Sequence, residues 1–485
     1  MNKRLVFRLL GGLMVLEAVL LLPAVAVSLI YGEDCSGFLY TICILLVIGV
    51  PCWNCIRPGT ENLNAKDGLA VAGFSWILMS FFGSLPFVFS GAIPNLIDAV
   101  FETVSGFTTT GATILTDVEN LPNSILFWRS FTHWIGGMGV LVLTVALLPK
   151  VSGRTTHLAR AESPGPTFSK LAPRMGDTAK ILYMIYGALT ALEFVALLFT
   201  GMPVFDCMIN AFATAGTGGF SNRNASIGAY NVAAEWVIAV FMMIFGVNFA
   251  VYFHMIRREF SQVAKNEEIW VFIAMVVLCT VGITVNILPV YGGNVGTSIR
   301  KAFFQVNTIM STTGFNTADY NQWPQFSRVL LTVLAFFGAC AGSTAGGFKL
   351  SRVVMLFKAA VREVRHMISP RKVSVVRMEG KPVQESTLSA VGFYLFVFTA
   401  FTLVSTMLVG LDPLKGNSVT TSFTSVLTCV TNVGPGMGSV VGPAGNFSGF
   451  APLTKLLFSI LMLAGRLEFY PMLALVSPAL WSKNR

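Results

Sequence analysis

The sequence predicts an all-α polytopic membrane protein with ten transmembrane helices: four parallel span–pore helix–span repeats around a central pore, and two extra N-terminal helices. Its 485 residues are 54% hydrophobic and only 12% charged. Apolar runs recur along the chain, and they reach the roughly 20 residues that a helix needs to cross a bilayer. A segment rich in threonine and glycine returns four times between such runs. Together these three observations predict the architecture.

Each predicted span is an apolar run between polar stretches. The first run follows Lys3, Arg4 and Arg8. It is longer than the apolar core of a signal peptide and lacks a clean cleavage site, so we expect a retained span. The eighth run is interrupted by small residues. The ten runs cover residues 5–30, 38–56, 68–90, 125–148, 179–200, 232–253, 269–290, 325–357, 388–410 and 451–480.

Basic residues gather on one side of the predicted membrane. Most of the 33 lysines and arginines fall in loops on the side of the N-terminus, above all in 149–178 and 358–387. The positive-inside rule therefore predicts that both termini are cytoplasmic. The net charge of +10 indicates orientation in membrane lipid, and we expect no nucleic-acid partner. Neither basic loop can bury a core of its own, so both are expected to be linkers or docking surfaces.

The threonine- and glycine-rich segments share one pattern. Each follows a semi-apolar stretch of roughly a dozen residues, which is too short to span a bilayer as a helix but can enter it and turn back. The segments align on Gly111, Gly219, Gly314 and Gly434, and two residues earlier stand the polar residues Thr109, Thr217, Thr312 and Asn432. The repeating unit is thus a span, a short re-entrant helix, a turn and a second span.

This unit divides the chain into five parts. The predicted parts are 1–60 with two N-terminal helices, 61–150 as repeat 1, 151–262 as repeat 2 with its basic loop, 263–365 as repeat 3, and 366–485 as repeat 4. Each repeat contains an even number of crossings, so all four share one orientation and surround an axis along the membrane normal. Their turns meet at one depth, where irregular backbone is tolerated only if it is buried or lines a water-filled path.

The chemistry expected of such turns is cation coordination. Carbonyl groups of a glycine-containing turn can replace the hydration shell of an ion, and no ring of carboxylates lies in the segments, which favours a weakly hydrated monovalent cation. Glu102 is a candidate for electrostatic support, and Asp98 is either such a support or an exposed helix cap. The predicted filter residues are Thr108, Thr109, Thr110, Gly111, Thr217, Gly218, Gly219, Ser311, Thr312, Thr313, Gly314, Thr431, Asn432, Val433 and Gly434.

The interruption of the eighth run, "GACAGSTAGGFK" at 338–349, is predicted to be a gate. A phosphate-binding loop would need Lys directly after the second glycine, and the order here does not fit. Close helix packing by small residues is the structural alternative. An irregular loop that lines the path below the filter is the functional one. The predicted gate residues are Gly338, Gly342, Ser343, Thr344, Gly346, Gly347 and Lys349.

Arg466 is a charge deep in the last apolar run. Such a charge is costly in lipid, so it usually faces the interior of the protein or a cavity. Its structural alternative is an ion pair with a nearby carboxylate. Glu468 is two residues away and does not share its helical face.

The chain resembles the membrane subunit of the Trk/Ktr potassium uptake family, of the Trk type (TrkH-like), over essentially its whole length. "FETVSGFTTTGAT" and "STTGFN" look like filter segments of that family, and "RAESPGP" with "PRMGDTAK" resembles its first cytoplasmic loop. "CAGSTAGGFK" resembles its intramembrane loop, and "GRLEFYP" its last helix. Two spans before the first repeat fit Trk rather than Ktr proteins.

The resemblance implies potassium as the transported ion, bound at the filter residues, and a bacterial cytoplasmic (inner) membrane location. It also implies a homodimer and a separate cytoplasmic nucleotide-binding regulatory subunit (TrkA-like). It places a gate at 338–349 and Arg466 near the pore below the filter. Gly216 and Gly218 in the second segment, and Asn432, Val433 and Pro435 in the fourth, depart from the pattern. Selectivity is therefore expected to be less strict than with four identical loops.

An ion-coupled secondary transporter of another small solute is the alternative function. Glu17, Glu193, His133 and His254 are candidate proton carriers, but a structural or interfacial role is the simpler interpretation of each. We expect no enzyme activity and no organic cofactor, because no metal-ligand cluster or serine nucleophile motif occurs. The sequence leaves open whether transport is passive or coupled to protons or sodium.

Overall fold

The computed structural model describes residues 2–56, 64–139, 175–372 and 374–481. This part of the chain is mainly helical, as predicted, with one short hairpin of β1 (Arg377–Met378) and β2 (Lys381–Pro382). Within these ranges six helices are long and apolar enough to cross a membrane, or seven if one bent pair counts as a span. The six are α1 (Lys3–Tyr31), α2 (Ser36–Asn54), α3 (Ala65–Phe89), α8 (Met175–Leu198), α13 (Glu267–Ile287) and α17 (Glu385–Val409).

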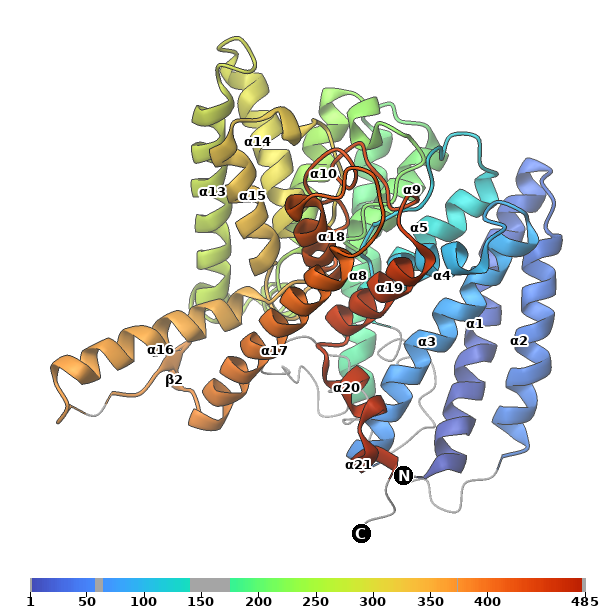
Figure 1. The fold of residues 1–485 in the computed structure, drawn as a ribbon, viewed down its shortest axis with the longest axis horizontal. Coiled ribbons are helices and arrows are strands. Elements are labelled where there is room, and N and C mark those ends of the chain that lie inside the picture. The colour runs from blue at the N-terminus through green and yellow to red at the C-terminus, as the bar shows by residue number, and fades with distance from the viewer. Residues whose placement is uncertain (1, 57–63, 140–174, 373, 482–485) are drawn as a thin grey trace.

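The two N-terminal helices form a hairpin on the outside of the bundle (Figure 1). Glycines let them approach closely, since a Cβ added to Gly11 of α1 would lie 2.6 Å from the Cβ of Cys52 in α2. Small residues at helix contacts are the usual device for packing in lipid, where the hydrophobic effect does not drive helices together. α1 and α2 both pack against α3, the first helix of the first predicted repeat.

A short buried helix follows each of the helices α3, α8, α13 and α17. Each has 12 to 16 residues, too few to cross a bilayer. Side chains of Asn95, Asn294 and Ser418 cap three of them by accepting backbone N–H groups, and a proline stands at the fourth N-cap. The four are α4 (Leu96–Phe107), α9 (Val204–Ala215), α14 (Val295–Met310) and α18 (Val419–Thr431).

The short helices and the helices that follow them make a closed cycle of contacts. After the short helices come α5 (Asn123–Gly137), α10 (Val232–Phe245), α15 (Gln325–Phe337) and α19 (Pro452–Arg466). α9 packs against α5, α14 against α10, α18 against α15, and α4 against α19. Each short helix thus contacts the second helix of the preceding predicted repeat, and the fourth closes on the first.

Breaks in the second helices are more numerous than the sequence predicted. The interruption at 338–349 is present, between α15 and α16 (Leu350–Ile368). The run 232–253, predicted as continuous, bends by 90° between α10 and α11 (Phe249–Ile256), where the Asn248 side chain caps α11. The run 451–480 breaks between α19 and α20 (Tyr470–Val476). The prediction of single helices there is wrong. Asn248 caps α11, and Glu468 and Phe469 adopt positive φ between α19 and α20, but neither feature changes the hydropathy of its run enough to be seen.

The remaining elements are short or peripheral. α16 and the β hairpin extend away from the helical body (Figure 1). The described part of the predicted span 125–148 ends at residue 139. The predicted basic loop 149–178 and the "RAESPGP" motif lie largely or wholly outside the described residues. The last short elements are η1 (Ser226–Ala229), η2 (Tyr320–Gln322), α12 (Phe260–Ala264) and α21 (Pro478–Trp481).

Candidate functional site

Each short helix ends in the same backbone turn. The residue two before the aligned glycine is left-handed in all four, with φ of 56° at Thr109, 54° at Thr217, 58° at Thr312 and 55° at Asn432. The next N–H then donates to the carbonyl five residues back, at 2.8–2.9 Å in every copy. This is the six-to-one bond of a Schellman helix end, built here mostly on threonine rather than glycine. The predicted alignment of the four segments thus coincides with a repeated geometry.

The four aligned glycines contact one another's segments in a ring. A Cβ added to each would collide with the carbonyl oxygen of the residue before the next glycine. The distances are 2.0 Å from Gly111 to Gly218 O, 2.0 Å from Gly219 to Thr313 O, 2.2 Å from Gly314 to Val433 O and 2.5 Å from Gly434 to Thr110 O. The contacts run from segment one to two, three, four and back to one. All four turns therefore lie together, as the sequence predicted.

Glycine is required in this ring for two reasons. Its φ values of 77°, 79°, 85° and 95° lie where side chains are strained. The neighbouring carbonyl also leaves no room for a Cβ. The ring holds the C-terminal ends of four helices, each of which contributes negative potential. It is thus an array of backbone oxygens in a field that favours a cation.

The hydroxyl groups of the segments brace the turns. Thr108 and Thr110 are joined through their Oγ1 atoms at 2.8 Å, and Ser311 and Thr313 in the same way at 2.7 Å. In the fourth segment Asn432 Nδ2 donates to Thr110 Oγ1 at 2.9 Å, which links that segment to the first. These side chains bond to one another and not to the space enclosed by the four turns, so they stabilise the shape of the turns.

A cavity of about 350 Å³ opens onto the ring. It is lined by all four aligned glycines and by residues that follow them, including Thr113, Ser221 and Asn316. Its polar lining suits a hydrated ion that approaches the ring from this side. The cavity therefore forms a vestibule of the candidate site.

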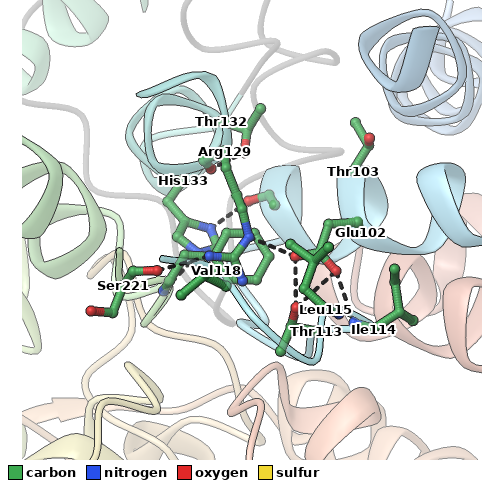
Figure 2. Close-up of polar contacts among 12 residues, drawn as sticks. Glu102, Thr103, Thr113, Ile114, Leu115, Val118, Arg129, Thr132, His133 and Ser221 are labelled. Carbon is green, nitrogen blue, oxygen red and sulfur yellow. Dashed lines mark hydrogen bonds and ion pairs between the residues drawn. The ribbon is translucent and has the colours of Figure 1, made fainter. Parts of the chain in front are cut away.

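A buried ion pair supports the first segment from beside the vestibule. Glu102 of α4 lies 2.6 Å from Arg129 Nε of α5, and its carboxylate accepts hydrogen bonds from Thr113 Oγ1 and Ile114 N (Figure 2). Glu102 therefore holds the segment that follows Gly111, through Thr113 and Ile114. Its carboxylate does so as part of an ion pair and not as a free charge. Asp98, in the first turn of α4, is half-buried and paired with Lys455 of α19 at 2.7 Å.

The loop 338–349 lies directly against the ring. Its Gly346 N–H donates to Thr312 Oγ1 at 2.7 Å, and a Cβ on Gly346 would lie 2.4 Å from Thr431 O. The two ends of the loop pinch together, since a Cβ on Gly347 would lie 2.8 Å from the Cα of Gly338. All predicted gate residues belong to this one folded loop. Three of the predicted gate residues have side chains that donate hydrogen bonds to backbone carbonyls. Ser343 Oγ donates to Cys340 O, Lys349 Nζ to Ala345 O and Thr344 Oγ1 to Phe245 O.

Glu268 of α13 fastens the loop from the other side. Its Oε1 accepts the N–H of Ala341 at 2.7 Å and the N–H of Ser351, at the start of α16, at 2.9 Å. Glu268 is buried, and nothing in its sequence surroundings distinguished it from an ordinary first-turn acid of a helix. A second attachment joins Gly342 O to Phe249 N, at the bend between α10 and α11.

Arg466 connects this loop to the end of α5. Its guanidinium donates to Thr344 O at 2.7 Å, to Gly136 O at 2.5 Å and to Gly137 O at 2.6 Å. Glu468 is paired with Arg352 at 2.5 Å. The guanidinium therefore holds together carbonyls of the loop and of the last turn of α5.

A helical membrane protein with a closed ring of backbone carbonyls beneath a polar vestibule belongs to the class of membrane ion transporters. The sequence profile of the TrkH family, described as a cation transport protein, matches residues 36–269 and 264–483. The chain belongs to this TrkH family, which is a family of cation transporters and not of enzymes.

Relatives in bacteria match over nearly the full length. The Trk system potassium uptake protein TrkH of Escherichia coli K12 is 37% identical, covering 99% of this chain and 100% of its own. The Trk system potassium uptake protein TrkG of the same strain is 34% identical, covering 99% and 98%. The crystal structure of the potassium transporter TrkH from Vibrio parahaemolyticus superposes with a TM-score of 0.88 at 32% identity, covering 99% of this chain and 100% of that one.

Proposed function

We propose that this protein takes up potassium across the bacterial cytoplasmic membrane through the ring of Gly111, Gly219, Gly314 and Gly434. The observation that carries the proposal is the closure of the ring, in which each glycine meets the carbonyl before the next. The names of the full-length relatives, which are potassium uptake proteins, support the choice of ion.

The chemistry of the ring favours potassium. Backbone carbonyls replace the hydration shell of a weakly hydrated monovalent ion, whereas divalent selectivity is usually built from rings of charged side chains. The carboxylate nearest the first segment, Glu102, is neutralised by Arg129. The four helix ends add a negative potential without adding a tightly binding charge. Potassium is the transported substrate, and no organic cofactor has a role in this mechanism.

The proposed arrangement in the membrane has ten spans in four parallel repeats, with both termini cytoplasmic. It is supported by the closed cycle in which α4, α9, α14 and α18 each pack against the second helix of the preceding repeat. In this arrangement the second helices of repeats 2, 3 and 4 each cross the membrane in two pieces, with irregular backbone only where protein surrounds it. The basic loops on one side support the orientation.

The loop 338–349 is the proposed gate, with Arg466 as its latch. The loop contacts the ring through Gly346 and is tied by Arg466 to Gly136 and Gly137. In this position its backbone and a buried positive charge lie close to the ring, where they oppose the passage of a cation. Opening then requires the loop to leave Thr312 and the guanidinium to release Thr344.

Regulation is proposed to come from other chains. A homodimer and a cytoplasmic nucleotide-binding subunit are supported by the shape of α16, which extends from the body and carries basic residues. Phe357 and Met367 of α16 are 71% and 81% exposed. Exposed apolar residues on a basic helix are typical of a docking surface. Lys358 of α16 pairs with Glu267, next to the loop anchor Glu268, so movement of α16 can reach the gate.

Ion flux into vesicles tests the proposed function. Purified protein in liposomes should take up potassium and rubidium faster than sodium, and protein-free liposomes give the background. Transport of neither ion, or equal rates for potassium and sodium, would contradict the proposal. The same flux with and without an imposed proton gradient distinguishes a passive path from coupled transport.

A further inference from the structure

The second turn of the ring has glycine at both positions where the first and third turns carry a bonded pair of hydroxyl groups. The residues three and one before the aligned glycine are Thr108 and Thr110 in the first segment, and Ser311 and Thr313 in the third. In the second segment both positions are glycine, at 216 and 218. The backbone does not require glycine there, because φ is −68° at Gly216 and Gly218 is not among the residues with positive φ.

The imidazole of His133 occupies the missing space. A Cβ added to Gly218 would lie 2.2–2.4 Å from three ring atoms of His133, and a Cβ added to Gly216 would lie 2.3 Å from His133 O. His133 belongs to α5, in the first repeat, and its side chain is fully buried. One residue of repeat 1 thus occupies both positions, with its imidazole at Gly218 and its backbone carbonyl at Gly216.

Both nitrogens of the His133 imidazole are hydrogen-bonded to backbone next to the first and second turns. Nδ1 lies 2.7 Å from Gly106 O, in the last turn of α4, and Nε2 accepts the N–H of Phe220 at 3.2 Å. This pattern fits a neutral imidazole that donates from Nδ1 and accepts at Nε2. Phe220 directly follows Gly219, so His133 holds the exit of the second turn against the helix that leads into the first.

Arg129, one helical turn earlier on α5, reinforces the same connection. Its Nη1 donates to Ser221 O at 3.0 Å, its Nε pairs with Glu102, and its guanidinium lies 3.7 Å from the centre of the Phe220 ring. Figure 2 shows Arg129 between Glu102 and Ser221, with His133 beside it. The two side chains of α5 therefore clamp the first and second turns together.

We propose that His133 is a positioning residue for ion selectivity, which replaces from a neighbouring repeat the hydroxyl pair that the second turn lacks. The inference rests on the proposed potassium filter. The ring oxygens Thr110 O and Gly218 O can keep one spacing only if the first and second turns stay in register. His133 fixes that register through Gly106 and Phe220, and Gly218 is the glycine that makes room for it.

A double-substitution test follows from the steric complementarity. Purified His133→Ala, Gly218→Thr and the double variant are placed in liposomes, and the ratio of potassium to sodium uptake is measured. Each single change should lower the potassium-to-sodium uptake ratio by about fivefold or more. A fivefold change in this ratio corresponds to about 1 kcal/mol, the typical net contribution of one hydrogen bond. In the double variant the threonine side chain occupies the space that the His133 imidazole fills in the wild type. Its potassium-to-sodium uptake ratio should therefore exceed the ratio of each single variant.

Matched controls remove a histidine or add a threonine elsewhere. His254→Ala changes a half-buried residue of α11, and Gly187→Thr adds a side chain where nothing lies within 4 Å, so both should keep the wild-type ratio. An unchanged ratio in folded His133→Ala, or a double variant no better than the worse single, would overturn the proposal.

Folding yield keeps the test decisive if a single variant is unstable. Gly218→Thr should then give less monodisperse protein than the double variant, and equal yields would contradict the proposed complementarity. The ratio of the recovered double variant is still compared with the wild type. Wild-type protein without potassium uptake would refute the proposed function itself, whereas normal wild-type uptake with unchanged variants would refute only the role of His133.

Discussion

The ring of four turns and the loop 338–349 are both buried, irregular and rich in glycine, yet they are held in different ways. In the ring, glycines at positive φ meet the carbonyl oxygens of neighbouring turns, so backbone packs on backbone. Several contacts of the loop come from side chains of other elements, namely Glu268, Thr312 and Arg466. A side chain can rotate away from a backbone group, whereas a ring of mutually packed backbones has no such freedom.

This difference fits the proposed combination of a fixed filter and a movable gate in one protein. Selectivity needs oxygens at a constant spacing, which the closed ring provides. Gating needs a segment with a second arrangement of nearly equal free energy. The loop has backbone bonds as well, such as Phe249 N–H to Gly342 O, but its contacts with Glu268, Thr312 and Arg466 depend on side chains that can rotate away. Changes in the ring should therefore alter ion preference, and changes around the loop should alter the rate at which ions pass.

Substitution of Gly111 should have the largest effect. Gly111→Ser introduces a Cβ at a φ of 77° and 2.0 Å from Gly218 O. Left-handed backbone costs about 1–2 kcal/mol for a residue with a Cβ, so the potassium-to-sodium uptake ratio should fall about tenfold or more. Gly392→Ser, where nothing lies within 4 Å, is the matched control in liposome flux assays. A wild-type ratio in folded Gly111→Ser would mean that the ring does not select.

Removal of the latch charge should come next. Arg466→Ala removes three hydrogen bonds to carbonyls of Thr344, Gly136 and Gly137, together with a positive charge. The initial rate of potassium uptake should rise several-fold, since hydrogen bonds from charged groups contribute about 1.5–3 kcal/mol each. Arg466→Lys keeps the charge and should lie between the two. An unchanged rate in folded protein would remove Arg466 from the gate.

Loosening of the loop anchor should change the rate less. Glu268→Gln keeps the shape of the side chain but weakens the acceptor for the N–H groups of Ala341 and Ser351. We expect potassium uptake to increase by a few-fold with the potassium-to-sodium ratio unchanged, because neutral hydrogen bonds are weaker than charged ones. Glu259→Gln, which changes an exposed carboxylate in contact with His254 Nδ1, is the matched control. A loss of ion preference in Glu268→Gln would break the distinction between ring and loop.

Removal of a single hydroxyl should have the smallest effect. Thr110→Val deletes the contact of Thr110 Oγ1 with Thr108 and with Asn432 but keeps the branched shape. Val433 occupies the same position in the fourth turn, so the ring already accommodates valine there. Each of these two neutral hydrogen bonds contributes only about 0.5–1.5 kcal/mol net, and neither involves a ring carbonyl, so the uptake ratio should stay within about fivefold of the wild type. A larger fall than in Gly111→Ser would show that hydroxyls, rather than carbonyls and glycines, determine selectivity.

The sequence predicted the parts of the site that repeat. The four aligned glycines and the polar residues two positions earlier are local patterns, and they coincide with the positive-φ positions of the turns. The interruption at 338–349 was also visible, because glycine and serine break an apolar run. A threonine- and glycine-rich segment is a weak indication of a site when it occurs once, and its fourfold repetition is what allowed the prediction.

Contacts between distant segments could not be read in the same way. His133 was interpreted as structural or interfacial because it falls near the end of a run, and only the fold shows its imidazole against Gly218. Glu268 resembled any acid in the first turn of a helix. The helix breaks at Asn248 and at Glu468 and Phe469 were missed because one or two residues hardly change the mean hydropathy of 20 neighbours.

The central claim, that the four turns form one cation site, is tested most directly by locating the ion. Crystals of the protein grown in rubidium, a potassium analogue with strong anomalous scattering, would show where the ion binds. We predict an anomalous peak inside the ring, bounded by the carbonyl oxygens of Thr110, Gly218, Thr313 and Val433. A ring without rubidium, with the ion bound elsewhere on the protein, would contradict the account.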